Sequence, residues 1–267
     1  MRGHKCLRAP GVIIIAFVVA MGMMPAQAHA CDKRSVPYDA RRAEYKGVIV
    51  IDAGHQKKAN LHKEPVGPGS GVTKPMVSGG TRGLYTGVPE YKITLIVAKK
   101  LRKSLENQGY KVYMVRTEND VDISNSRRAK FANSKKADLF IRLHCDGADN
   151  HGISGFLTLT PKKNKWTKDF YKESANAAKL IHKATLKTTK AKDRGIAERG
   201  DLTGFNYSKV PSVLFEMGLM TNKAEDKKLS TGKYQNKLVK GMVNGVNKYF
   251  ASKKPDKELA REVQARF

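Results

Sequence analysis

The feature that most constrains this fold is an uninterrupted run of β-branched apolar residues early in the chain. Residues 48–51 read Val-Ile-Val-Ile, and Asp52 follows them directly. A strand with one face in water alternates polar and apolar residues, so a run without polar residues is typical of a strand buried on both faces. Residues 210–218 contain a second buried strand, which carries Glu216 near its end. Strands of this kind belong to sheets that helices cover on both faces.

Amphipathic segments between the apolar runs supply those helices. After Pro89, apolar residues recur every four positions from Ile93 to Leu105, and Gly109 is placed to end the helix. Further strands are expected at 48–52, 110–115, 137–144 and 152–160, and further helices at 124–136, 166–188 and 233–250. Residues 56–89 and 193–208 are expected to be irregular, the first as a long loop. The alternation predicts a single-domain α/β fold with a mainly parallel, twisted sheet flanked by helices.

Charge is the unusual property of the composition. The 267 residues carry 51 Lys+Arg against 24 Asp+Glu, a formal net charge of +27. A field of this sign favours polyanionic surroundings, namely nucleic acid, anionic lipid or an anionic cell-wall polymer. The charge alone does not choose among them.

The first thirty residues indicate which of these partners the protein meets. A basic start is followed by an uncharged apolar run from Gly11 to Met24 and by small residues up to Ala30, which is the pattern of a secretory signal. Cleavage would remove Arg2, Lys5 and Arg8 and lower the formal charge from +27 to +24. Export favours the cell envelope, either periplasm or cell wall, and makes nucleic acid an unsuitable partner. No stable membrane span is expected after cleavage, and lipidation of Cys31 stays open.

These patterns divide the chain into four parts. Residues 1–30 are the expected signal peptide and 31–46 a polar leader. Residues 47–251 form the expected catalytic domain, and 252–267 a basic tail that is too short to be a binding module.

Four polar residues stand where parallel strands end or the following helix begins. His55 follows the first strand, His144 closes the strand at 137–144, Glu216 lies near the end of the later strand, and Glu90 opens the first helix. Strand carboxyl ends and the amino ends of the following helices lie at one edge of a parallel sheet. We therefore expect the four side chains to meet at this edge, although they are far apart in sequence.

This set of residues has the composition of a catalytic zinc site. Two histidines and a carboxylate, with water in the fourth position, are a usual ligand set, and a further carboxylate would accept the proton of that water. The spacing does not decide whether Glu90 or Glu216 is the ligand. Asp52 and Asp146 are candidates for orienting a ligand, and Asp146 is also a competing ligand. The other histidines considered are expected at the surface: His62, His151 and His182.

Four segments in order resemble a known family. They are 48–56 (VIVIDAGHQ), 87–116, 126–147 and 210–226, and together they resemble zinc-dependent N-acetylmuramoyl-L-alanine amidases of the Amidase_3 type, which are bacterial cell-wall hydrolases. The resemblance covers roughly residues 46–250. It implies one zinc ion, with ligands at His55, Glu90 and His144, and a catalytic glutamate at Glu216. It also implies hydrolysis of the amide between N-acetylmuramic acid and the L-alanine of the stem peptide.

The chain departs from the family pattern beside two ligands. Gln56 replaces a glycine that commonly follows the first histidine, and Arg142 replaces a serine two residues before the third ligand. These changes concern the substrate and not the metal. About seventy residues separate His144 from Glu216, and the elements expected there leave no helix to cover the site. We therefore expect an open site.

Two other functions compete with this one. A different zinc-dependent peptidoglycan peptidase would use the same residues on the same fold. A secreted basic wall-binding protein without turnover would use only the charge. The peptidoglycan itself is the expected partner in every case, with anionic wall polymers bound through the basic surface.

Overall fold

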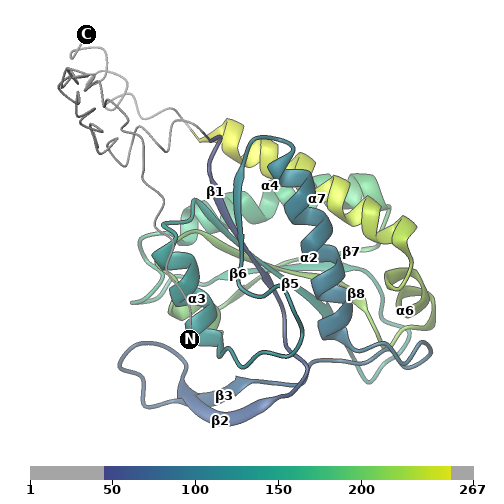
Figure 1. Ribbon diagram of the computed structural model, residues 1–267, viewed down its shortest axis with the longest axis horizontal. Coiled ribbons are helices and arrows are strands. Elements are labelled where there is room, and N and C mark those ends of the chain that lie inside the picture. The colour runs from purple at the N-terminus through teal and green to yellow at the C-terminus, as the bar shows by residue number, and fades with distance from the viewer. Residues whose placement is uncertain (1–44, 254–267) are drawn as a thin grey trace, which may run out of the picture. The chain divides into compact units, whose positions relative to one another are not determined.

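A six-stranded sheet forms the centre of the fold, in the order β4-β1-β5-β8-β6-β7 (Figure 1). The computed structural model describes residues 45–253. The predicted signal peptide, nearly all of the leader and all but the first two residues of the tail lie outside this range. The strands of the sheet are β1 (Val48–Ala53), β4 (Lys111–Met114), β5 (Leu139–Asp146), β6 (Phe156–Pro161), β7 (Asp193–Arg199) and β8 (Ser212–Leu219).

The sheet is mainly parallel, as predicted. Strand β1 pairs in parallel with β4 and β5, β5 with β8, and β6 with β7, while β6 runs antiparallel to β8. Every residue of β1 is buried. Ile49 and Ile51 belong to one core cluster, and Val50 between them belongs to another, with Phe140 and Ala129. The uninterrupted apolar run therefore reflects burial on both faces of the strand.

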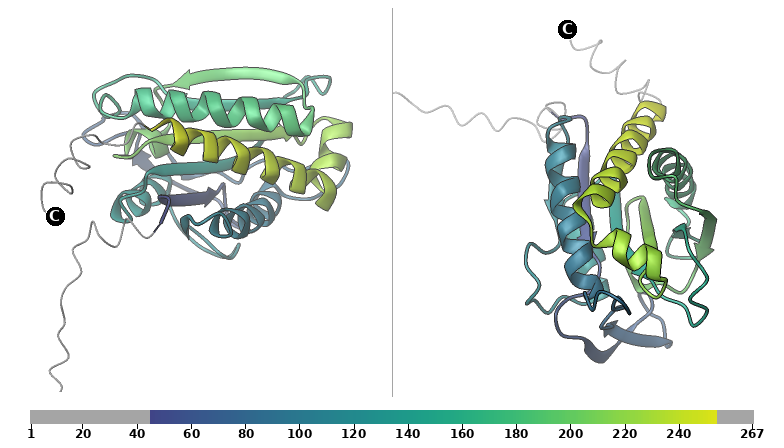
Figure 2. Two further views of the ribbon diagram at one scale, coloured as in Figure 1. Left: turned by 90° about the horizontal axis from the view of Figure 1, so that it is seen from above. Right: turned by 90° about the vertical axis from the view of Figure 1, so that its right-hand side faces the viewer.

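Helices cover both faces of the sheet. On one side, α7 (Gly232–Ser252) packs between α2 (Glu90–Glu106) and α4 (Tyr171–Thr189), and α6 (Lys223–Leu229) follows β8 (Figure 2). On the other side lie α3 (Asn125–Ser134) and the short α5 (Thr203–Asn206). The predicted end of α2 is confirmed, because Gly109 has a φ of +86° just beyond this helix. Ser124 caps α3 by accepting from the backbone N–H of Arg127.

Two segments expected to be irregular contain strands. The long loop includes an antiparallel hairpin of β2 (Asn60–Pro65) and β3 (Thr73–Val77), and 193–208 includes β7 and α5. The hairpin lies beside α3, where the Asn125 side chain donates to the carbonyl of Met76 (Figure 1). Most hairpin and β7 residues are exposed or only partly buried, so their sequences lack the apolar runs by which the other strands are recognised.

Candidate metal centre

Three side chains from separate elements converge at the carboxyl edge of the sheet. His55 follows β1, Glu90 is the first residue of α2, and His144 lies on β5. His55 Nε2 lies 3.2 Å from Glu90 Oε1, and His144 Nδ1 lies 3.1 Å from each of these two atoms. Tetrahedral ligands at zinc distances of about 2.0–2.1 Å stand about 3.4 Å apart, so the triangle has the size that a zinc ion requires. These residues fit the metal that the sequence resemblance implies.

Surrounding backbone groups fix the orientation of these side chains. His55 Nδ1 lies 2.9 Å from the carbonyl of Ser78, which accepts its N–H and leaves Nε2 with a lone pair for a metal. Glu90 accepts hydrogen bonds from the backbone N–H groups of Thr81 at 2.7 Å and Cys145 at 2.9 Å. His55 itself has a left-handed φ of +59°, a strained conformation for a residue with a side chain.

Gly54 makes room for the third residue of the cluster. A Cβ atom at this position would lie within 2.6 Å of both ring nitrogens of His144. The residue with the left-handed conformation at this turn is His55 and not Gly54. The glycine is needed because its backbone packs against an imidazole from another strand.

The charges of the cluster suit a divalent cation. Burial raises the pKa of Glu90, but hydrogen bonds from His144 and His55 outweigh it and hold the pKa well below its usual range. Burial lowers the pKa of His144 to about 4. At neutral pH the cluster therefore offers an ionised carboxylate and a neutral imidazole at His144.

Glu216 stands beside the cluster on the neighbouring strand. It is in register with His144 across the β5–β8 pair. Its Oε2 atom is buried and has no hydrogen-bond partner among the described residues. Burial raises the pKa of Glu216 well above its usual value, and the charges of Glu90 and Asp146 raise it further. A buried acceptor without a partner, next to a possible metal, is a candidate for proton transfer.

The two candidate orienting aspartates bind arginines. Both oxygens of the fully buried Asp52 are engaged, one with Arg128 Nη1 at 2.7 Å and the other with Arg142 Nε at 2.9 Å. Asp146 accepts from Arg194 Nη1 at 2.9 Å. Neither aspartate hydrogen-bonds to a histidine among the described residues. Their contact with the cluster is indirect, through backbone and neighbouring side chains.

Arginines that the sequence did not single out organise the same edge. Arg116 donates to the carbonyls of Ala53 and Gly54, and Arg128 donates to the carbonyl of His55, so both hold the turn that carries the first histidine. Among 51 basic residues, no local signal distinguishes the buried ones.

The prediction that His182 lies at the surface was wrong, because this residue is buried between Thr158 and Asp193.

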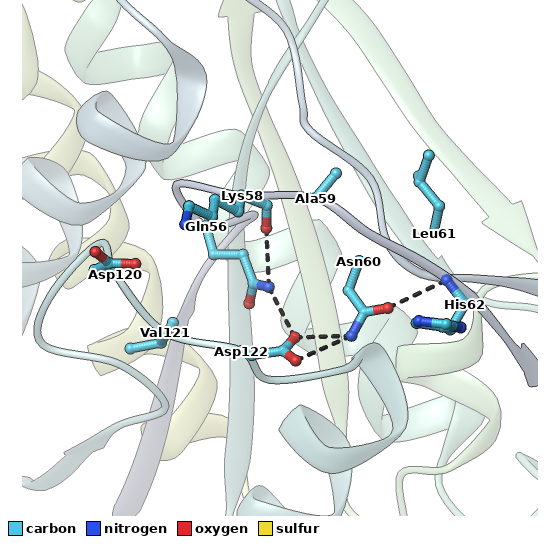
Figure 3. A pocket seen from close by; sticks show the side chains of 9 residues that line it. All are labelled: Gln56, Lys58, Ala59, Asn60, Leu61, His62, Asp120, Val121 and Asp122. Carbon is cyan, nitrogen blue, oxygen red and sulfur yellow. Dashed lines mark hydrogen bonds between the residues drawn. The ribbon is translucent and has the colours of Figure 1, made fainter.

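The cluster borders two hollows, and a larger pocket does not include it. One hollow of about 310 Å³ and one of about 230 Å³ both include His55, His144 and Glu216. A pocket of about 890 Å³ is lined by residues after β1 and β4, where Gln56 and Asn60 donate to Asp122 (Figure 3). Since His55, Glu90, His144 and Glu216 do not line this pocket, we place the chemistry in the two smaller hollows.

Comparison with known proteins identifies the relatives of this chain. A family model described as N-acetylmuramoyl-L-alanine amidase matches residues 49–248. The N-acetylmuramoyl-L-alanine amidase Rv3717 of Mycobacterium tuberculosis is 26% identical over 211 residues, which are 77% of this chain and 87% of that protein. The uncharacterised protein YqiI of Bacillus subtilis is 29% identical over 165 residues, 61% of this chain and 76% of that protein.

Solved structures share the fold. The amidase Ami1 of Mycobacterium smegmatis superposes with a TM-score of 0.70 at 24% identity, covering 79% of this chain and 99% of that one. An N-acetylmuramoyl-L-alanine amidase of Clostridium difficile 630 has a TM-score of 0.64 at 28% identity, covering 78% and 98%.

Proposed function

Because the chain belongs to the N-acetylmuramoyl-L-alanine amidase family, we propose that His55, Glu90 and His144 hold one zinc ion and that Glu216 is the general base. The enzyme is a peptidoglycan hydrolase that cleaves the amide between N-acetylmuramic acid and L-alanine of the stem peptide. The observation that carries the zinc proposal is the triangle of ligand atoms, each 3.1–3.2 Å from the others.

Bound by His55, Glu90 and His144, a zinc ion would lower the pKa of a bound water to about 7 and would polarise the substrate carbonyl. The protein supplies the proton transfers. Glu216 Oε2, which lacks a partner among the described residues, accepts the proton of the attacking water and passes it to the departing nitrogen of L-alanine.

Both hollows reach the centre and give the substrate room there. The segment between His144 and Glu216 forms β6, α4, β7 and α5. Helix α4 packs on α7 and on β6, β7 and β8, and it belongs to the helical layer on the face of the sheet. This arrangement supports an open site, with glycan leaving in one direction and peptide in the other.

Analysis of the products tests the bond that is cleaved. Purified peptidoglycan is digested with the protein and the soluble fragments are examined by mass spectrometry. The proposal predicts free stem peptides that begin with L-alanine. Shortened peptides still attached to glycan would instead identify a peptidase, and binding without products would identify a wall-binding protein.

A second part of the proposal is that the enzyme is exported and held on anionic wall polymers, and the layer of α2, α4 and α7 supports the attachment. The exposed acidic residues on these helices are Glu106, which pairs with Arg102, and Glu173. Exposed lysines include Lys99, Lys103, Lys172, Lys179, Lys183, Lys187, Lys233, Lys237, Lys240 and Lys248. None of the helices in residues 45–253 is long and apolar enough to cross a membrane. The basic layer therefore offers attachment by charge.

Binding to an anionic wall polymer is expected to weaken steeply as salt rises, because exposed charges are screened over about 8 Å at physiological ionic strength. Replacing Lys179, Lys183 and Lys187 of α4 by glutamine should weaken binding at low salt and flatten the salt dependence. A control with the same charge change away from this layer replaces Lys58, Lys63 and Lys209. Sedimentation with purified wall polymer measures both. Equal losses in the two variants, or binding that salt leaves unchanged, would contradict attachment through the layer.

A further inference from the structure

The smaller of the two hollows at the metal centre, called the cleft from here on, carries three basic side chains. The cleft has a volume of about 230 Å³, and its wall includes His144 and Glu216 at the centre and Lys74, Arg142 and Arg199 beyond them. The basic residues come from β3, β5 and β7, so the fold gathers them from distant parts of the chain. The amidase reaction itself assigns no role to any of them.

The guanidinium of Arg142 is fixed in position at the cleft. Its Nε donates to Asp52 at 2.9 Å and its Nη2 to Asn125 Oδ1 at 2.7 Å, and only 4% of the side chain is exposed. The remaining nitrogen, Nη1, has no hydrogen bond to another described residue. Nη1 lies against Gly204, which also lines the cleft and where any side chain would collide with it. The Nη1 group of a rigid, buried cation, with its two N–H donors, is thus left for a ligand.

The other two cations share one carboxylate. Asp201 accepts from Lys74 Nζ at 2.6 Å and from Arg199 Nε and Nη2, each at 2.8 Å. Two positive charges on one negative charge leave this group with an excess of one. Asp52 is likewise shared between Arg142 and Arg128. The cleft therefore suits an anion, and planar arginines suit a carboxylate in particular.

The spacing along β5 indicates which carboxylate fits. Arg142 and His144 are two residues apart on one strand, so their side chains share a face about 7 Å apart. In a stem peptide, the second residue is a glutamate linked through its side-chain carboxyl, and its α-carboxylate is either free or amidated. That group lies at most about two residue lengths, ~7 Å, from the nitrogen of the scissile amide.

We propose that Arg142, supported by Arg199 and Lys74, binds the free α-carboxylate of the second stem-peptide residue and so selects acidic over amidated peptidoglycan. This inference rests on the proposed function and names the substrate class of the same site. An amide in place of the carboxylate loses the charge and keeps one acceptor oxygen instead of two, so its hydrogen bond to a guanidinium is not charge-assisted. Selectivity therefore comes from the stronger attraction of the acid.

The test measures binding in an enzyme that does not turn over. Zinc-loaded protein carrying Glu216→Gln is titrated with N-acetylmuramoyl-L-alanyl-D-isoglutamate and with the D-isoglutamine form. The acid should bind about tenfold or more tightly than the amide, as expected for a charge-assisted hydrogen bond. Adding Arg142→Gln should remove this preference, and adding Arg102→Gln, an arginine on the exposed side of α2, should keep it. Equal binding of the two ligands by the parent, or a preference that survives Arg142→Gln, would overturn the inference.

The design separates a failure of this inference from a failure of the variant to fold and from a failure of the proposed function. Should Arg142→Gln fail to fold, Arg142→Lys keeps a positive charge beside Asp52 and lacks the planar fork, so a reduced preference is expected there and an unchanged one counts against the inference. The parent's own preference is measured without any variant at Arg142. Because binding needs no turnover, absence of hydrolysis by the wild-type enzyme would refute the proposed function alone, and absence of a preference would refute this inference alone.

Discussion

Replacing Glu216 by glutamine is expected to lower kcat by about 10²–10⁴-fold, the usual contribution of a positioned general base. Glutamine keeps the size of the side chain and removes its ability to accept a proton from water. Zinc content should stay at the wild-type level, because the ligand triangle is made by His55, Glu90 and His144. Release of stem peptides from peptidoglycan measures kcat, and elemental analysis of the same preparation measures zinc.

A matched variant isolates the role of position 216. Glu198→Gln makes the same substitution at an exposed residue of β7 and should leave kcat and zinc content unchanged. Full activity in Glu216→Gln would remove this residue as the base. Loss of zinc from it would make Glu216 a ligand and reopen the choice between the two glutamates.

Replacing Asp52 by asparagine is expected to lower the free energy of unfolding by about 3–5 kcal/mol, the cost of breaking a buried ion pair from one side. Asp52 is fully buried between Arg128 and Arg142, at 2.7 and 2.9 Å. The asparagine leaves both guanidinium groups buried without their counter-charge. Urea unfolding at pH 7 measures the change. Asp120→Asn, at a mostly exposed residue paired with Lys57, is the control and should leave unfolding unchanged.

The same carboxylate gives the wild-type protein an acid-dependent stability. Burial raises the pKa of Asp52, but Arg128 and Arg142 outweigh it and hold the pKa well below its usual value of 3.8. A lowered folded-state pKa stabilises the protein fully above pH 3.8, and this stability is lost as pH falls below that value. The free energy of unfolding of the wild type should therefore approach that of Asp52→Asn in this acid range. A difference between the two free energies that stays constant down to about pH 2 would contradict the lowered pKa of Asp52.

The fold was predictable where burial leaves a pattern in the sequence. Strands β1 and β8 were found because a strand buried on both faces is uniformly apolar. Helix α2 was found because a helix that packs on a sheet has apolar residues every three to four positions. The β2–β3 hairpin was missed because it lies at the surface, where Leu61 and Val72 are about two-thirds exposed, at 66% and 65%. Strand β7, at one edge of the sheet, was missed for a related reason, because none of its residues is fully buried.

The candidate site was predictable where topology alone brings residues together. The ends of β1, β5 and β8 and the start of α2 meet at one edge of the sheet, so His55, His144, Glu216 and Glu90 were placed there before any contact was known. Contacts that depend on side-chain conformation were not predictable. The pairing of Asp52 with Arg128 joins residues 76 positions apart, and Gly54 and His144 are 90 positions apart, so neither contact leaves a local pattern.

Zinc binding and activity, measured on the same preparations, test the central claim most directly. Wild-type protein is stripped with a chelator, assayed for release of stem peptides, and assayed again as zinc is added back, alongside Glu90→Gln. The account predicts that activity disappears with the metal and returns in full at one equivalent of zinc, and that Glu90→Gln neither holds the ion nor recovers. Full release of stem peptides by the metal-free wild-type protein, or by Glu90→Gln, would contradict it.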